Sequence, residues 1–398
     1  MPRFPKTRYL TRTAIVLGAV VVIALSGMRA IRYAHGLSFV VRAASLHGAI
    51  GRLAELDTMP ETERLVQLPL QHEQVTARVY TPVRHPRQTV LLVSGLHPAG
   101  IDEPRLVAFA RELARTRVTV VTPDIPELRR FEIAPTLTDR VEQAAVSVAT
   151  DESLAPTGRI GLMGISFSGG LAVVAAGRPR LRNHLSYVFA LGGHDDLPRV
   201  LRYLSTGIEA PPPGATARSR DGLGIPRAPH EYGLAIVLFI VADRLVPIAQ
   251  VEPLRDGVRR FLRASYLDRR AAKQEYAAIG ELASRLPPPA GALLASLNDR
   301  DVAALGPILL PHLESLPDVP ALSPSRSPAP TVPVFLLHGS SDTVIPSAES
   351  EYLADRLRGR IRVRLLVTDL VSHAEAHERA RAADLLRLTG FWADLLAR

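Results

Sequence analysis

The chain has 398 residues, of which 47% are hydrophobic and 22% charged, so it can bury a large core and is not disordered. Its net charge is +9, but only Lys6 and Lys273 are lysines, and the arginines are spread among acidic residues. This spread, together with an aromatic content of 5%, argues against a nucleic-acid-binding protein. The sequence contains no cysteine, which excludes disulfide bonds, thiolate catalysis and cysteine metal sites.

Residues 1–45 predict a location at the membrane. An uncharged apolar run at 14–28 is bracketed by basic residues: Arg3, Lys6, Arg8 and Arg12 before it, Arg29 and Arg32 after it. We interpret the run as an uncleaved signal anchor, with the N-terminus in the cytoplasm and the remaining chain outside. A cleaved signal peptide, and hence a secreted protein, is the alternative.

The first half of the chain predicts an α/β fold. Segments 63–70 and 74–82 alternate apolar and polar residues, as strands at a sheet edge do. Short apolar strands then alternate with helical periodicity, which is typical of a parallel sheet with crossover helices. These strands are expected at 89–95, 118–125, 159–164 and 185–193.

After residue 196 the pattern changes to proline clusters and helical segments, with a buried helix expected at 233–242. Residues 316–333 are rich in proline and predict an extended linker. Strands at 332–339 and 362–369, a helix from about Ser347 and a terminal helix follow. We therefore divide the chain into a signal anchor (1–45), a core (46–196), a helical cap insertion (197–330) and a second core segment (331–398).

The stretch "RIGLMGISFSGGLAVVAAG" (159–177) places Ser166 between a strand and a helix. A tight turn there would expose the hydroxyl, and the helix N-terminus would favour developing negative charge. Gly164 and Ser168, two positions to either side, are small enough for the turn to close. Ser166 could instead only cap the helix, and Ser168 is a second candidate nucleophile.

This turn and the strands around it resemble the α/β-hydrolase family, over about residues 63–196 and 331–398. The usual G-x-S-x-G reads "GISFS" here, with Ser168 in place of the second glycine. The resemblance implies an α/β-hydrolase fold, with a mostly parallel sheet flanked by helices and interrupted by the cap. It also implies a catalytic triad in the chain order Ser, acid, His.

The resemblance assigns the other site residues by position. Asp342 in "HGSSDTVIP" matches the acid loop, with Asp195 and Asp196 as the fallback. His373 matches the base, and His377 is the weaker candidate. The backbone N–H groups of Phe167 and Leu96 match the oxyanion donors, whereas His97 is expected to have a structural or substrate-contacting role.

These assignments predict a membrane-tethered serine hydrolase that acts on an ester or related acyl bond of a small or lipid-like substrate. No metal cluster, P-loop or dinucleotide motif is recognisable, so we expect no cofactor. Two alternatives are an acyltransferase with the same triad and a non-catalytic protein that binds through the same pocket. The oligomeric state cannot be predicted from the sequence.

Overall fold

The computed structural model describes residues 27–44, 48–84, 86–214, 224–314, 320–371 and 382–398. The chain divides into two compact units, one formed by Met1–Thr58 with Arg381–Arg398 and the other by Met59–Ala380.

Three helices make up the described part of the first unit: residues 27–43, α2 (Ala49–Glu55) and α14 (Ala382–Leu396). A Cβ at Gly36 would lie 2.6 Å from a backbone carbonyl oxygen of α14, so this close helix approach requires glycine. Nearby, the rings of Phe39 and Trp392 pack with their centroids 4.4 Å apart.

Within the described residues, no helix is both long enough and apolar enough to cross a bilayer. The expected signal anchor at 14–28 lies outside the described residues, apart from its last two positions.

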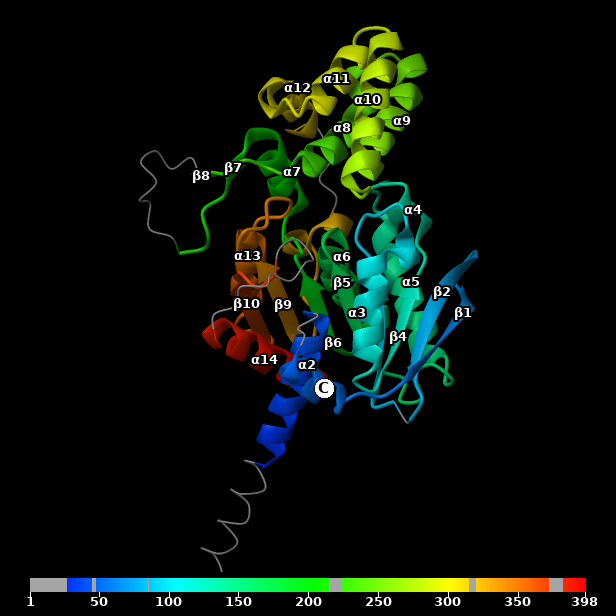
Figure 1. Cartoon of the computed structure of the whole chain (residues 1–398), viewed down its shortest axis with the longest axis vertical. Helices are drawn as coiled ribbons and strands as arrows, with labels where there is room; N and C mark the ends of the chain where they lie inside the picture. Colours follow the sequence, from blue (N-terminus) through cyan, green and yellow to red (C-terminus); the bar gives the residue numbers. More distant parts are fainter. Residues whose placement is uncertain (1–26, 45–47, 85, 215–223, 315–319, 372–381) are drawn as a thin grey trace, which may run out of the picture. The chain divides into compact units, whose positions relative to one another are not determined.

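An eight-stranded sheet forms the centre of the second unit, in the order β1-β2-β4-β3-β5-β6-β9-β10 (Figure 1). Strand β2 is antiparallel to both its neighbours, and the strands from β4 onward in that order run parallel. The strands are β1 (Glu61–Pro69), β2 (Gln74–Pro82), β3 (Gln88–Val93), β4 (Val118–Pro123), β5 (Ile160–Ile165), β6 (Leu185–Leu191), β9 (Val334–Gly339) and β10 (Val363–Thr368).

All eight predicted strands are confirmed to within a few residues. The central strands are buried along nearly their whole length because helices cover both faces of a parallel sheet. The connecting helices are α3 (Pro104–Ala114), α5 (Thr136–Thr150), α6 (Phe167–Ala176) and α13 (Ser347–Leu357), with shorter segments η1 (Gly100–Asp102), α4 (Pro126–Arg129) and η2 (Pro179–Leu181).

Six α-helices and a small strand pair are described between β6 and η3, and α8 to α12 gather beyond one end of the sheet (Figure 1). The expected buried helix at 233–242 is confirmed as part of α8, where residues 233–239 are all buried. The elements are α7 (Leu197–Thr206), β7 (Ile208–Glu209), β8 (Ile225–Pro226), α8 (Glu231–Leu245), α9 (Ile248–Ala264), α10 (Arg269–Arg285), α11 (Ala290–Asn298) and α12 (Val302–Glu314).

The expected extended linker at 316–333 is partly wrong. Two short 3₁₀ helices, η3 (Pro320–Leu322) and η4 (Pro324–Arg326), form within it. Proline stands at the first position of each, where its fixed φ suits a helical turn and its missing N–H is not needed. Leu322 and Ser323 are buried, so this segment packs on the core.

Candidate active site

Ser166 lies on a sharp turn between β5 and α6. Its backbone has φ 55° and ψ −131°, a left-handed conformation that costs a non-glycine residue about 1–3 kcal/mol. Its N–H donates to the carbonyl of Leu191 at 2.7 Å, which ties the turn to β6. A Cβ at Gly164 would lie 2.1 Å from the carbonyl oxygen of Ser168, so the turn closes only with glycine at 164.

The geometry does not support the interpretation of Ser166 as a simple helix cap. Ser166 occupies the N-cap position, but its side chain makes no capping hydrogen bond. The alternative nucleophile Ser168 is fully buried, and its Oγ has no hydrogen-bond partner within the described part of the chain. Ser166 is therefore the better candidate for a reactive hydroxyl.

Both expected oxyanion donors lie close to Ser166. Phe167 is the first residue of α6, where helix geometry leaves the N–H without an intrahelical partner. The loop after β3 runs beside the turn, since a Cβ at Gly95 would be 3.3 Å from the Cβ of Ser166. In the described ranges, neither Phe167 nor Leu96 donates its N–H to another protein group.

A buried histidine holds the side chain of Phe167. The rings of Phe167 and His194 stack with centroids 5.3 Å apart and planes 5° apart. His194 Nε2 donates to the carbonyl oxygen of Leu322 at 2.7 Å, and burial lowers the pKa of His194, which keeps the ring neutral. Sequence reasoning missed this contact because it joins β6 to the segment around η3, far apart in the chain.

Asp342 follows β9 and is almost fully buried. Its Oδ1 accepts hydrogen bonds from the N–H groups of Val344 at 2.8 Å and Ile345 at 3.0 Å, as in an Asx turn. Its Oδ2 lies 3.5 Å from Nε2 of His338, a residue of β9 that is itself fully buried and bonded through both ring nitrogens. The aspartate is thus fixed in one orientation by its own loop.

Residues of the 197–230 segment hold the same loop from outside. Arg227 donates to the carbonyl oxygens of Ser340 at 3.1 Å and Asp342 at 3.5 Å, and it pairs with Glu209 at 3.2 Å. Tyr203 Oη donates to the carbonyl of Thr343 at 3.2 Å. No motif in the sequence signals these contacts, because each depends on how distant segments meet.

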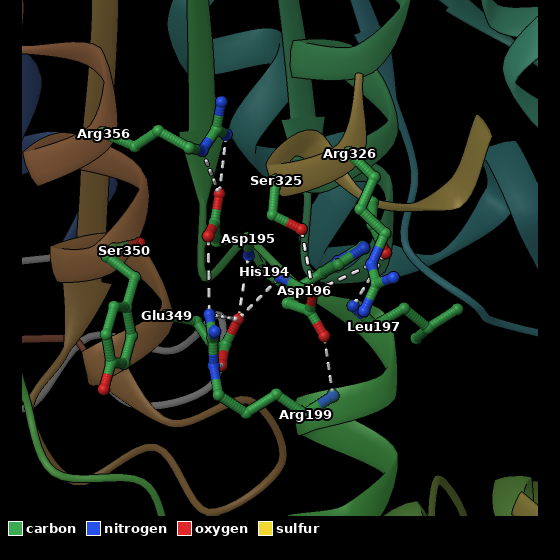
Figure 2. A network of polar contacts seen from close by, with 12 residues as sticks. His194, Asp195, Asp196, Leu197, Arg199, Ser325, Arg326, Glu349, Ser350 and Arg356 are labelled. Carbon is green, nitrogen blue, oxygen red and sulfur yellow. Dashed lines mark hydrogen bonds and ion pairs between the residues drawn. The ribbon is translucent and has the colours of Figure 1, made fainter. Parts of the chain in front are cut away.

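The fallback acids, Asp195 and Asp196, belong instead to a polar network (Figure 2). Asp195 accepts from Arg356 at 2.7 Å, and the N–H groups of both aspartates donate to Oε2 of buried Glu349 at 2.9 Å. Arg199 bonds Glu349 through two nitrogens. This network gives the carboxylates a structural role.

Asp196 also caps α7 by accepting from the N–H of Arg199 at 3.0 Å. Burial by itself would raise the pKa of Asp196, but hydrogen bonds from Arg199 N–H and Ser325, with nearby arginines, lower it overall. The carboxylate is therefore ionised and fully engaged.

The sheet register brings the turn of Ser166 and the loop of Asp342 to one edge. Ile165 pairs with Leu191, and Leu191 pairs with Leu337, so β5, β6 and β9 end at the same level. Strand β10 lies beside β9 and ends at that edge too. The expected base His373 and its alternative His377 lie outside the described residues.

His97 packs in an aromatic cluster that joins the loop after β3 to the helices beyond the sheet. Its ring meets Tyr266 edge-on at 4.0 Å, and its Nδ1 accepts from the N–H of Ala99 at 3.1 Å. Tyr232, at the start of α8, donates through Oη to the carbonyl of Leu96 at 2.7 Å. Burial lowers the pKa of His97 to about 4, against the opposing effect of the Glu103 carboxylate and with a smaller contribution from the Arg105 charge. These contacts agree with the structural role expected for His97.

The sheet order with its one antiparallel inner strand, and the strained serine turn after β5, define an α/β-hydrolase fold, as expected. In the part of the chain that the structure describes, no three His, Asp or Glu residues are grouped to hold a metal ion.

No protein-family model and no curated protein matches this sequence. Among solved structures, an esterase from Pyrobaculum calidifontis is 17% identical, covers 87% of this chain and 85% of its own, and has a TM-score of 0.41. A lipase in an open form is 17% identical, covers 85% of this chain and 100% of its own, and has a TM-score of 0.43. A thermostable carboxylesterase from a metagenomic library is 18% identical, covers 85% of this chain and 91% of its own, and has a TM-score of 0.42. These similarities are too distant to carry an assignment of substrate or mechanism.

Proposed function

We propose that the protein is a cofactor-independent serine hydrolase that cleaves an ester or related acyl bond. Ser166 attacks the acyl carbon, His373 accepts the serine proton and later protonates the leaving alcohol, and Asp342 orients the imidazole and stabilises its charged form. The N–H groups of Phe167 and Leu96 stabilise the oxyanion of the tetrahedral intermediate.

The strained turn at Ser166 is the observation that carries this proposal. A serine that only caps a helix would bond a backbone N–H with its side chain and would not require a positive φ. Ser166 has a positive φ and makes no capping bond, as expected of a nucleophile whose oxygen must be accessible beside N–H donors. The turn and the loop of Asp342 are separated by one strand, β6, and neighbouring strands are about 4.8 Å apart. The two backbones are therefore roughly 10 Å apart, close enough for the proposed imidazole of His373 to lie between the two side chains.

The helices of 197–314 are proposed as the cap that bounds the substrate pocket. The same segment reaches the loop of Asp342 through Arg227, just before α8, and the loop of Leu96 through Tyr232 of α8. Substrate identity would then depend on residues of this segment more than on the triad.

We also propose that residues 14–28 tether the enzyme to a membrane, with the catalytic unit on the outer side. The apolar run and its flanking basic residues support this placement. A tethered protein would fractionate with membranes and resist salt washing. A mature N-terminus near residue 27 would contradict the tether and indicate a secreted enzyme.

A fluorophosphonate probe tests the catalytic proposal directly, because it labels only an activated serine. Wild-type protein and Ser168→Ala are expected to be labelled, since the side chain of Ser168 is fully buried and out of reach of a probe. Ser166→Ala is expected to lose both labelling and ester hydrolysis. Labelling of Ser166→Ala would contradict the assignment, and no labelling of wild type would favour a non-catalytic binding protein. Product analysis with added alcohols would reveal an acyltransferase.

A further inference from the structure

A pocket of about 290 Å³ lies beside the oxyanion loop and has an unusual lining. Its charged residues are all arginines: Arg129 and Arg130 from the end of α4, and Arg259 and Arg263 from α9. The ring of Phe131, with two prolines, supplies apolar surface. No acidic residue lines the pocket, so its chemistry suits an anion attached to an apolar group.

Acidic neighbours hold three of these guanidinium groups in place. Arg130 is bonded by Glu132 through two nitrogens, at 2.8 and 3.0 Å, and this pairing raises the pKa of Arg130. Arg129 pairs with Asp124 at 3.0 Å, and Arg259 pairs with Glu252 at 3.3 Å and with Asp256 at 2.5 Å. A guanidinium has five N–H donors, so these pairs leave donors for a ligand. The acidic partners also neutralise much of the arginines' positive charge, so long-range attraction is weak. The pocket would therefore recognise an anion by direct hydrogen bonds.

Arg263 differs from the other three. It lies one helical turn after Arg259 on α9 and is exposed. Its charge contributes to the lowered pKa of Glu275, but within the described residues no acidic group lies within 4.0 Å of its guanidinium, so its N–H donors can face a ligand.

The pocket shares a wall with the proposed reaction centre. Pro98, which lines the pocket, is two residues after Leu96, a span of at most about 7 Å. The ring of Phe131 packs on Tyr232 at 6.3 Å, and Tyr232 bonds the carbonyl of Leu96. Phe131 is buried and has φ 60°, a strained conformation for a bulky residue that places its ring at this junction.

We propose that this arginine pocket binds a carboxylate or phosphate on the substrate, so that the enzyme prefers anionic esters over neutral esters. The proposal rests on the hydrolase function proposed above and names the substrate class for that site. Bidentate contacts from Arg130 and Arg263 would hold the anion, while Phe131 packs against the adjoining chain.

Matched substrates test the preference. Two p-nitrophenyl esters with acyl chains of equal length, one ending in a methyl group and one in a carboxylate, are compared. In Arg130→Gln/Arg263→Gln, kcat/KM for the carboxylate ester is expected to fall tenfold or more, with less than a twofold change for the neutral ester. Arg285→Gln, an exposed arginine on α10, is the matched control and should change neither value. Equal changes for both esters would overturn the proposal.

Binding to the inactive protein separates this proposal from the hydrolase assignment. In Ser166→Ala, calorimetry is expected to detect binding of hexanoate or hexyl phosphate, the stronger ligand indicating which anion is preferred, and no binding of hexanol. Adding Arg130→Gln/Arg263→Gln should abolish anion binding. Anion binding that survives the arginine changes, or that is absent altogether, would overturn the pocket. Hydrolysis retained in Ser166→Ala would overturn the catalytic assignment while these binding results still test the pocket.

Discussion

The turn of Ser166 and the loop of Asp342 lie at the same edge of the sheet but are held in different ways. The serine turn depends on its own sequence, because glycine at 164 is the condition for its closure. The loop of Asp342 fixes that side chain with its own N–H groups but is also bonded from elsewhere by Arg227, which donates to two of its carbonyl oxygens. Positions such as Gly164 can therefore be recognised in a sequence, whereas the supports of the acid loop cannot.

The largest expected effect separates the two candidate acid positions. Asp342→Asn should lower kcat about 10⁴-fold, because an amide cannot hold the imidazole in its working tautomer. Asp195→Asn should change kcat less than about tenfold but lower the free energy of unfolding by about 1–3 kcal/mol, since it weakens the network with Arg356. Steady-state kinetics and urea unfolding measure both. Collapse of activity in Asp195→Asn with near-normal Asp342→Asn would reverse the assignment.

Gly164→Ala tests the local support of the serine turn. The new Cβ would meet the carbonyl oxygen of Ser168, which is backbone and cannot move cheaply. We expect a loss of about 3 kcal/mol or more in the free energy of unfolding, with loss of activity. Gly280→Ala in α10 is the control, because its nearest contact is 3.6 Å away and alanine favours a helix. A Gly164→Ala protein as stable as wild type would show that the turn has another conformation.

Arg227→Gln tests the distant support of the acid loop. Loss of the guanidinium removes bonds to Ser340 and Asp342 and leaves Glu209 buried without its ion-pair partner. We expect kcat to fall about tenfold and stability to fall by about 1–2 kcal/mol. Arg227→Lys keeps the positive charge but cannot donate to two carbonyl oxygens in the geometry of a guanidinium. Compared with Arg227→Gln, it should therefore restore the free energy of unfolding more than kcat. Unchanged kcat in Arg227→Gln would mean that the loop holds itself.

The last prediction concerns the loop after β3, which resembles the loop of Asp342 in being contacted by residues of the 197–314 segment. His97 has a folded-state pKa of about 4, below the unfolded value of about 6.5. The unfolded chain therefore binds a proton first, and stability is lost as pH falls from about 6.5 to 4. His97→Asn, which can still accept from Ala99 N–H, should lose less stability over that range, as measured by urea unfolding. His72→Asn, at an exposed loop, is the control, and equal pH dependence in all three proteins would contradict the prediction.

The order of strands and helices could be predicted from the sequence because apolar periodicity reflects local geometry. The eight strands, the helix at Ser347 and the buried helix at 233–242 all follow from residues that are neighbours in the chain. The linker at 316–333 shows the limit of such reasoning, since proline also starts 3₁₀ turns and the packing of this segment on the core decides its shape.

For the site, the sequence alone determined the position of Ser166, because a strand, a helix and small residues at fixed spacing specify the turn. It also favoured Asp342 as the acid from its place after a strand, with Asp195 as the fallback. The network that engages Asp195 with Arg356 and Glu349, which lie more than 150 positions further along the chain, could not be predicted from the sequence. The arginine pocket was equally invisible, since α4 and α9 contribute separate pairs of arginines that only folding brings together. Contacts between distant segments leave no local pattern, and this is why those features required the structure.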